Sequence, residues 1–229
     1  MAKQRRIDPL QVLIEVVVIT IGIVLAYQLN AMREVNKTKE AEFKALQEIK
    51  SNLELDLIDL TVNQTAHENA LVLIDSLEQW DGPYEDQIGM MLFQIFRDYL
   101  FLPQTSAFET LKAKGVDLIT NDSIRIKTQR LYDFYYQILI KYESEYEANQ
   151  LYDDFEWVVT TYYKSFPVRD LNADPIPKVR SSAWLKDDEV TTRLDLCKFE
   201  HQYSLAAYQK VKVEINNLIA SIDKELKSR

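Results

Sequence analysis

The chain is poor in the residues that break or crosslink structure. Its 229 residues include only 4 Gly, 6 Pro and 1 Cys. So few Gly and Pro residues favour long uninterrupted helices, and no glycine-rich phosphate-binding loop is present. The single cysteine, Cys197, excludes an internal disulfide framework. We expect it to be a small buried apolar side chain.

Residues that carry most enzyme chemistry are also scarce. Of the 2 His residues, neither has Glu three positions before it, so the Glu-x-x-His pairs of di-iron bundles are absent. There is no Gly-x-Ser-x-Gly elbow and no paired-cysteine metal spacing. The net charge of −9 argues against nucleic-acid binding, which needs clustered Lys and Arg. The sequence nominates no catalytic residue, cofactor or metal ligand, which favours a non-enzymatic protein without excluding an enzyme.

The few polar groups with chemical potential have ordinary interpretations. His201 lies on an apolar helix face and is expected in the core, whereas His67 lies in a polar stretch and is expected at the surface. Cys197 and His201, one turn apart, would bind a metal only with ligands from elsewhere. Runs of acids are typical of solvated helix faces. These runs are Glu143, Glu145 and Glu147, and Asp153, Asp154 and Glu156.

One apolar run, residues 10–31, contains a single acid, Glu15. About 20 apolar residues are needed to cross a bilayer as a helix. No small-x-small site follows the run, which argues against a cleaved signal peptide, and a buried helix of a soluble core is usually shorter. The sequence therefore predicts a short basic N-terminus (1–9), a transmembrane helix (10–31) and a helical domain (32–229). The basic N-terminus favours a cytoplasmic start, with the bulk of the chain outside the cytoplasm.

A stripe of polar and small residues follows one face of the predicted span: Gln11, Glu15, Gly22 and Ala26. Small residues four positions apart allow two membrane helices to approach closely. An acid inside a span is costly unless it finds a partner or reaches the headgroups. One interpretation is self-association or docking onto another membrane protein. In the other, Glu15 simply reaches the headgroups and Gly22 is incidental. A weaker hypothesis places Glu15 in an oligomeric ion path.

Helical periodicity continues through the rest of the chain, and no strand-type alternation persists. The fold class is therefore all-α, with the membrane helix continuing into an antiparallel bundle of long helices. A loop is expected over about 167–186. The expected helices are the continuous helix to Trp80, 84–101, a short helix from Ser106, a long helix capped by Asn121 or Asp122 and ending near Phe166, and the last helix from Asp187 or Asp188.

The third long helix is dense in tyrosine. Leu131, Tyr135, Ile138, Tyr142 and Tyr146 recur at helical spacing. Core packing with hydroxyls at the edge is the favoured interpretation, and a ligand cage is the alternative.

Two segments resemble an uncharacterised bacterial membrane family, DUF6090. The first is Glu15 with the run Gly22–Asn30. The second is Ser106-Ala107-Phe108-Glu109-Thr110-Leu111-Lys112, then Gly115 and Leu118–Ser123. The chain departs from the family at Ala31-Met32, where members carry Asn and Trp. The resemblance implies a Gram-negative inner-membrane protein with a helical soluble domain, and it brings no catalytic residues.

The second segment is expected to have a structural role. Ser106 and Glu109 have the spacing of a helix capping box. Phe108 and Leu111 are expected to pack inward, Gly115 to turn the chain, and Asn121 to begin the long helix.

These observations predict a single-pass, membrane-anchored helical scaffold, sensor or docking protein. The expected partners are the membrane and either a second copy or another inner-membrane protein, with no nucleic acid. The alternative is a small-ligand-binding or hydrolytic domain with its site between the tyrosine-rich helix and the loop at 167–186.

Overall fold

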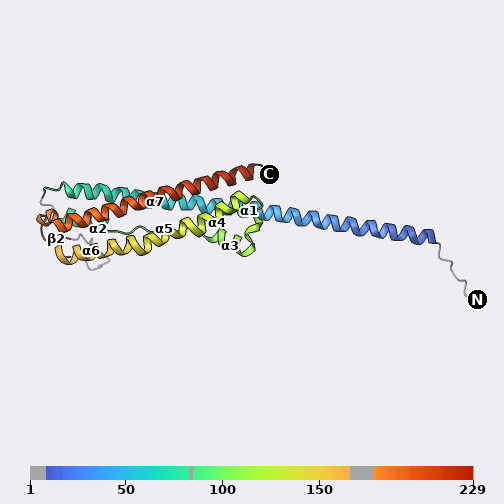
Figure 1. Cartoon of the computed structure of the whole chain (residues 1–229), viewed down its shortest axis with the longest axis horizontal. Helices are drawn as coiled ribbons and strands as arrows, with labels where there is room; N and C mark the ends of the chain where they lie inside the picture. The colour runs from blue at the N-terminus through green and yellow to red at the C-terminus, as the bar shows by residue number, and fades with distance from the viewer. Residues whose placement is uncertain (1–8, 83–84, 166–177, 229) are drawn as a thin grey trace, which may run out of the picture.

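The computed structural model describes residues 9–82, 85–165 and 178–228. It shows an elongated all-α bundle from which one helix projects as a single rod (Figure 1). That helix, α1, runs from Pro9 to Glu78 and is 70 residues long. Pro at the first helical position leaves the hydrogen bonds of the rest of the helix intact. Its last turn is closed by Lys186, whose ammonium group donates to the Glu78 carbonyl at 2.8 Å. The predicted end at Trp80 was two residues too late.

The C-terminal helix α7 (Asp188–Lys227) packs antiparallel to the distal part of α1. Pairs along the interface show the direction, because α7 numbers fall as α1 numbers rise. These pairs are Lys50–Asp223 at 2.6 Å, Thr61–Lys212 at 3.0 Å, His67–His201 at 2.8 Å and Asp75–Lys198 at 2.6 Å. The predicted start of α7 is confirmed, with Asp187 as its N-cap residue.

A third rod also runs antiparallel to α7, as Tyr135–Glu214 and Arg193–Asp154 contacts show. It consists of five consecutive helical pieces, two of them π-helical. They are α4 (Asp122–Arg130), η2 (Leu131–Tyr135), α5 (Tyr136–Tyr142), η3 (Glu143–Glu147) and α6 (Ala148–Tyr162).

Two short strands contradict the expectation that the chain has no strand. β1 (Tyr163–Ser165) pairs antiparallel with β2 (Lys178–Val179), so the third rod ends at Tyr162 rather than Phe166. Strands of two or three residues are too short to show alternation in a sequence. The predicted loop at 167–186 is only partly described: its first eleven residues lie outside the described chain. Its last part contains β2 and the 3₁₀ turn η4 (Ala183–Lys186).

The fourth layer is not a full helix. It begins with α2 (Glu85–Ile95) and ends with α3 (Ser106–Lys114) and the short turn η1 (Val116–Leu118). Between α2 and α3, residues 97–105 have no regular structure, and we call this segment the strap. The predicted helix 84–101 was therefore too long. Phe101 is buried in the strap, and Pro103 cannot donate a backbone hydrogen bond.

The core has two apolar clusters. The first surrounds α1 residues 46–60 and includes Phe101, Phe108 and Tyr136. The second surrounds α1 residues 74–77 and includes Ile88 and Trp184. The first cluster lies nearer the projecting part of α1 and the second nearer the far tip (Figure 1). The α1 segment between them carries buried polar side chains instead.

Leu53→Ala is expected to lower the free energy of unfolding by about 2–5 kcal/mol, because Leu53 is fully buried and the lost side chain leaves a cavity. Urea unfolding of the full chain in detergent, followed by circular dichroism, measures this. Ile126→Ala is the matched control, since Ile126 is 59% exposed and its truncation should cost less than about 0.5 kcal/mol. Equal losses in both variants would contradict the assigned core.

Candidate functional site

A layer of buried polar side chains separates the two apolar clusters. His67 of α1 and His201 of α7 are both 0% exposed, and their Nδ1 atoms lie 2.8 Å apart. The burial of His201 was predicted, but the surface position predicted for His67 was wrong. Its immediate neighbours are polar, yet His67 follows Leu53 and Leu60 at seven-residue steps on the buried face of α1. That periodicity was the signal that local polarity obscured.

The contacts of the two His rings fix their tautomers. His201 Nε2 lies 2.9 Å from the Ile95 carbonyl and therefore carries a hydrogen. Its Nδ1 then accepts from His67 Nδ1, which leaves His67 Nε2 as an acceptor facing the Tyr208 hydroxyl at 3.3 Å. Burial, reinforced by the neighbouring His201, lowers the pKa of His67 to about 3. Burial also lowers the pKa of His201. Both rings are therefore neutral at physiological pH.

Glu143 extends this layer to the third rod. Its Oε1 accepts from the Tyr208 hydroxyl at 2.6 Å, and its Oε2 accepts from the Phe101 backbone N–H at 2.9 Å. The prediction of a solvated Glu143 was wrong, because this side chain is 1% exposed. Burial raises its pKa to about 7, although both hydrogen bonds act in the opposite direction. The carboxyl therefore exchanges its proton near neutral pH.

The Tyr208 hydroxyl contacts three polar groups in this layer. Besides Glu143 and His67, it lies 3.1 Å from the Tyr99 carbonyl. One hydroxyl proton cannot serve all three neighbours at once. When Glu143 holds a proton, the carboxyl can donate to Tyr208, which frees the hydroxyl proton for another acceptor. The geometry thus accommodates both protonation states of Glu143.

Other carboxylates hold the strap. Asp56 of α1 accepts from the Gln104 N–H at 2.7 Å and from the Tyr136 hydroxyl at 2.6 Å. Asp59 accepts from the Leu102 N–H at 3.1 Å. Burial raises the pKa of Asp56 to about 6, and its two hydrogen bonds oppose this shift. These acids accept hydrogen bonds from backbone N–H groups of the strap, whose Leu102 and Gln104 lie at the surface.

Asp154 also corrects the expectation of a solvated acidic run. It is 0% exposed and pairs with Arg193, whose guanidinium lies 4.2 Å from the centre of the Trp157 ring. Because Asp154 lies on α6 and Arg193 on α7, the pair links these two helices.

Cys197 is buried, as predicted. Its Sγ lies 3.5 Å from His201 Nε2, but that nitrogen also faces the Ile95 carbonyl. Within the described residues, no group of three or more His, Cys, Asp or Glu side chains is placed to hold a metal. The structure therefore supplies no third ligand there for the Cys197–His201 alternative.

The structural motif after the strap follows the sequence expectation in most respects. Phe108 and Leu111 are each 2% exposed, and Phe108 stacks on Tyr132 with ring centres 4.4 Å apart. Gly115 has φ 99° and ψ 124°, a conformation that favours glycine. The predicted capping box was wrong, because Thr105 occupies the N-cap position. Glu109 instead pairs with Lys112 at 2.8 Å.

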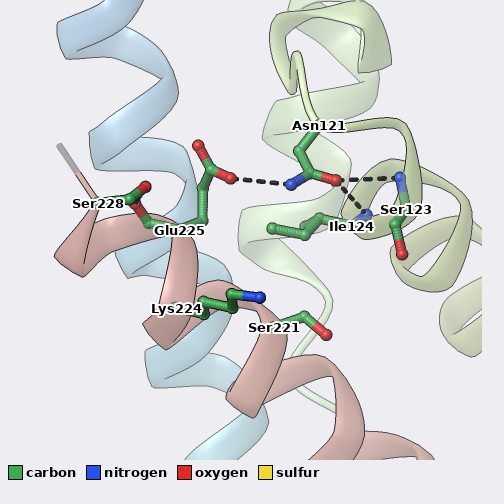
Figure 2. A pocket seen from close by; sticks show the side chains of 7 residues that line it. All are labelled: Asn121, Ser123, Ile124, Ser221, Lys224, Glu225 and Ser228. Carbon is green, nitrogen blue, oxygen red and sulfur yellow. Dashed lines mark hydrogen bonds between the residues drawn. The ribbon is translucent and has the colours of Figure 1, made fainter.

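Asn121 is the N-cap of α4, as predicted. Its Oδ1 accepts from the N–H groups of Ser123 and Ile124 at 3.1 and 3.3 Å (Figure 2). Its Nδ2 donates to Glu225 of α7 at 2.8 Å and so links the two rods. A pocket of about 300 Å³ lies between them, at the end of the bundle where α1 emerges. Its other lining residues are Ser221, Lys224 and Ser228.

The tyrosine-rich rod buries only part of the expected stripe. Leu131 is buried as expected, and Tyr135 and Tyr142 are half-buried, but Ile138 is 52% exposed. The fully buried side chains nearby are instead those of Tyr132, Tyr136 and Leu139. Four-residue steps drift by about 40° on a straight α-helix, and the wider π turn η2 compensates for this drift. Sequence periodicity assumed an α-helix throughout and so selected a neighbouring face. The side chain of Tyr146 lies outside the described residues.

An apolar groove of about 290 Å³ lies between α5 and α7. Tyr135 and Tyr142 line it, but its other wall is α7 rather than the loop at 167–186 in which the ligand-site alternative placed the second side. Their hydroxyls donate to Glu214 and Glu200, which are not among its lining residues. The groove is thus an apolar surface with polar edges, and no described carboxylate points into it as a catalytic group.

The N-terminal stripe lies on the projecting part of α1. Glu15, Gly22 and Ala26 are exposed, and a Cβ at Gly22 would meet no atom within 4 Å. The side chain of Gln11 lies outside the described residues. In the described chain, α1 is the one helix long and apolar enough to cross a membrane, and its most apolar stretch is 0% buried. The stripe is therefore available to a partner outside this chain.

A family model described as "Family of unknown function (DUF6090)" matches residues 15–166. The match includes the projecting helix, the strap, the Phe108–Asn121 motif and the third rod. No curated protein and no solved structure matches the chain.

Glu143→Gln is expected to change how the free energy of unfolding depends on pH. The folded chain retains the Glu143 proton up to about pH 7, whereas the unfolded chain releases it near the ordinary value of 4.5. The bound proton therefore contributes fully to the free energy of unfolding below pH 4.5. This contribution is lost as the pH rises through 7. Gln does not titrate, so wild type should lose roughly 3 kcal/mol relative to the variant between pH 4.5 and 8.

Denaturant unfolding across that pH range, in detergent, measures this difference. Asp56→Asn is the matched control, because the corresponding loss should be complete near pH 6. The His residues titrate alike in wild type and variant and cancel. A difference between wild type and Glu143→Gln that is independent of pH would contradict the buried proton.

Proposed function

The chain belongs to the DUF6090 family, whose function is unknown, and from this premise we propose that it is a single-pass membrane-anchored scaffold that docks a partner inside the bilayer. One observation carries the proposal. Helix α1 is unbroken from Pro9 to Glu78, with a bare apolar N-terminal part and a buried distal part. A helix of this kind is suited to join a membrane to a folded domain.

The exposed apolar side chains support the membrane assignment. About 20 residues of helix extend roughly 30 Å, the thickness of a bilayer core. Within residues 10–31, large apolar side chains are about half exposed or more on every side of the helix. They include Leu13 at 58%, Val18 at 62%, Ile23 at 65% and Leu25 at 54%. Such a surface is stable in lipid and costly in water.

The proposed location is the inner membrane of a Gram-negative bacterium. The N-terminus would lie in the cytoplasm and the bundle in the periplasm, as the basic residues before the span favour. Because no break separates the span from the bundle, a movement of the span would be passed directly to the α1–α7 interface. A sensor or scaffold needs such a connection, whereas a simple tether does not.

The docking site is the stripe formed by Gln11, Glu15, Gly22 and Ala26. Gly22 and Ala26 would let another membrane helix approach closely. Glu15 would gain a hydrogen-bonding partner that lipid cannot supply. The partner is either a second copy or another inner-membrane protein.

The groove between α5 and α7 supports a second candidate function, the binding of a small apolar ligand. Its lining is apolar, and Lys210 stands at its edge. Ala206→Trp would fill the groove, so saturable binding of a hydrophobic fluorescent probe that this substitution abolishes would favour ligand binding. Probe binding that is unchanged in the variant would exclude the groove.

Cysteine crosslinking in native membranes tests the docking stripe. In a Cys197→Ala background, Ala26→Cys is expected to form disulfide-linked or crosslinker-linked adducts. Val24→Cys, about 200° away around the helix, is the matched control and should form few. Adding Glu15→Ala or Gly22→Leu to Ala26→Cys should reduce the adducts several-fold. Equal crosslinking at positions 24 and 26, or no effect of either added substitution, would disprove the stripe.

A further inference from the structure

The bundle leaves one face of α1 uncovered. Eight positions at alternating three- and four-residue spacing are all exposed, and none is charged. We call them the back face: Ser51, Leu55, Ile58, Val62, Thr65, Asn69, Val72 and Ser76. Its large apolar members are 50–63% exposed, which is unusual for four aligned residues on a solvated helix.

The back face lies opposite the buried face of α1. The bundle packs against Leu53, Leu60 and His67, which point about 170° away from the centre of the back face. Alternating three- and four-residue spacing of apolar residues is the seam pattern of a coiled coil. The acids Glu54, Glu68 and Asp75 lie along one edge of the back face. They limit the uncharged strip to the width of one contacting helix.

We propose that the back face is the contact surface between two copies of this chain, paired in parallel and in register. This inference rests on the proposed membrane anchor, which would place both copies in one bilayer and in the same direction. With both helices starting at the same depth, each residue of the back face meets its own counterpart. Asn69 would then face Asn69, as a polar residue at a seam position does when it fixes register.

The span and the back face share one side of a single helix. Gly22 and Ile58 are 36 residues apart, as are Ala26 and Val62, which is ten turns at about 3.6 residues per turn. Helix α1 is continuous over this distance. A second copy that contacts Gly22 and Ala26 therefore has its own back face turned toward this one.

The contact has two parts. Between them, Arg33, Lys37, Glu40 and Lys44 occupy the same side of the helix and are exposed, so this stretch stays hydrated. The back face is about 37 Å long and the stripe about 20 Å, which gives roughly 600 Å² per copy for a strip 10 Å wide. The total of about 1,200 Å² is the lower limit for a stable specific interface. Confinement of both copies to one membrane raises their effective concentration, so an interface of this size is sufficient.

The charges that flank the back face are compatible with a parallel pair. In a parallel pair, Glu54 of one copy lies near Asp59 of the other, and two acids would repel. Each is already engaged within its own chain: Glu54 pairs with Lys50 at 3.7 Å, and Asp59 accepts from the Leu102 N–H. The remaining edge pairs are uncharged on at least one side. A strip one helix wide accommodates one partner helix, which favours a dimer over larger assemblies.

Crosslinking of the full chain in native membranes tests the back face. In a Cys197→Ala background, Val62→Cys should form a disulfide-linked dimer under mild oxidation. Val213→Cys is the matched control, because Val213 is similarly exposed, at 47%, on α7. We expect at least fivefold more dimer at position 62. Ile58→Asp should reduce that dimer at least fivefold, whereas Ile126→Asp, equally exposed on α4, should not. Unchanged circular dichroism shows that both Asp variants are folded.

The outcomes separate this inference from the proposed function. Dimers at both Ala26→Cys and Val62→Cys support the two together. Dimers at Ala26→Cys without dimers at Val62→Cys overturn the back-face contact and leave the docking stripe standing. Dimers at Val62→Cys with no adduct of any kind at Ala26→Cys support the back face and overturn the stripe. An adduct at Val62→Cys with the mass of a different protein, or no adduct at either position, overturns the back-face dimer.

Discussion

The strap imposes the strongest constraint on this fold. Its backbone N–H and C=O groups have no helix to satisfy them where Phe101 is buried against the bundle, and buried unpaired groups of this kind cost about 1–3 kcal/mol each. Glu143 and Asp56 supply acceptors for the Phe101 and Gln104 N–H groups. Tyr208 donates toward the Tyr99 carbonyl. Buried acids, which would ordinarily be destabilising, here hold the irregular strap against the bundle, with Phe101 as its buried residue.

The polar layer follows from the same constraint. Where α2 ends and the strap begins, the Ile95 carbonyl has no helical donor, and His201 provides one. His67 completes the chain of hydrogen bonds to Tyr208 and thus to Glu143. The two apolar clusters are joined through this layer rather than through continuous apolar packing. Its chemistry is therefore explained by folding, without a substrate.

Helix α1 packs into the bundle along one face and carries the surfaces that we propose contact the membrane and a second copy. The buried face organises both clusters, and the opposite face is uncharged over residues 51–76 and small or polar within the proposed span. Both faces belong to one uninterrupted helix. The proposed functional contacts therefore lie along this helix rather than in a pocket.

The sequence by itself determined the all-α class, the continuous first helix, the start of α7 and the roles of Phe108, Gly115 and Asn121, because periodicity and capping are local properties. It could not determine the burial of His67, Glu143 and Asp154. These residue types are usually solvated, and the partners that satisfy them, His201, Tyr208 and Arg193, lie on α7. The break after Ile95 and the face of the tyrosine-rich rod were likewise decided only by the tertiary structure. After Ile95, the hydrogen bonds made to the strap backbone outweighed the local helical pattern. In the tyrosine-rich rod, the wider π turns did so.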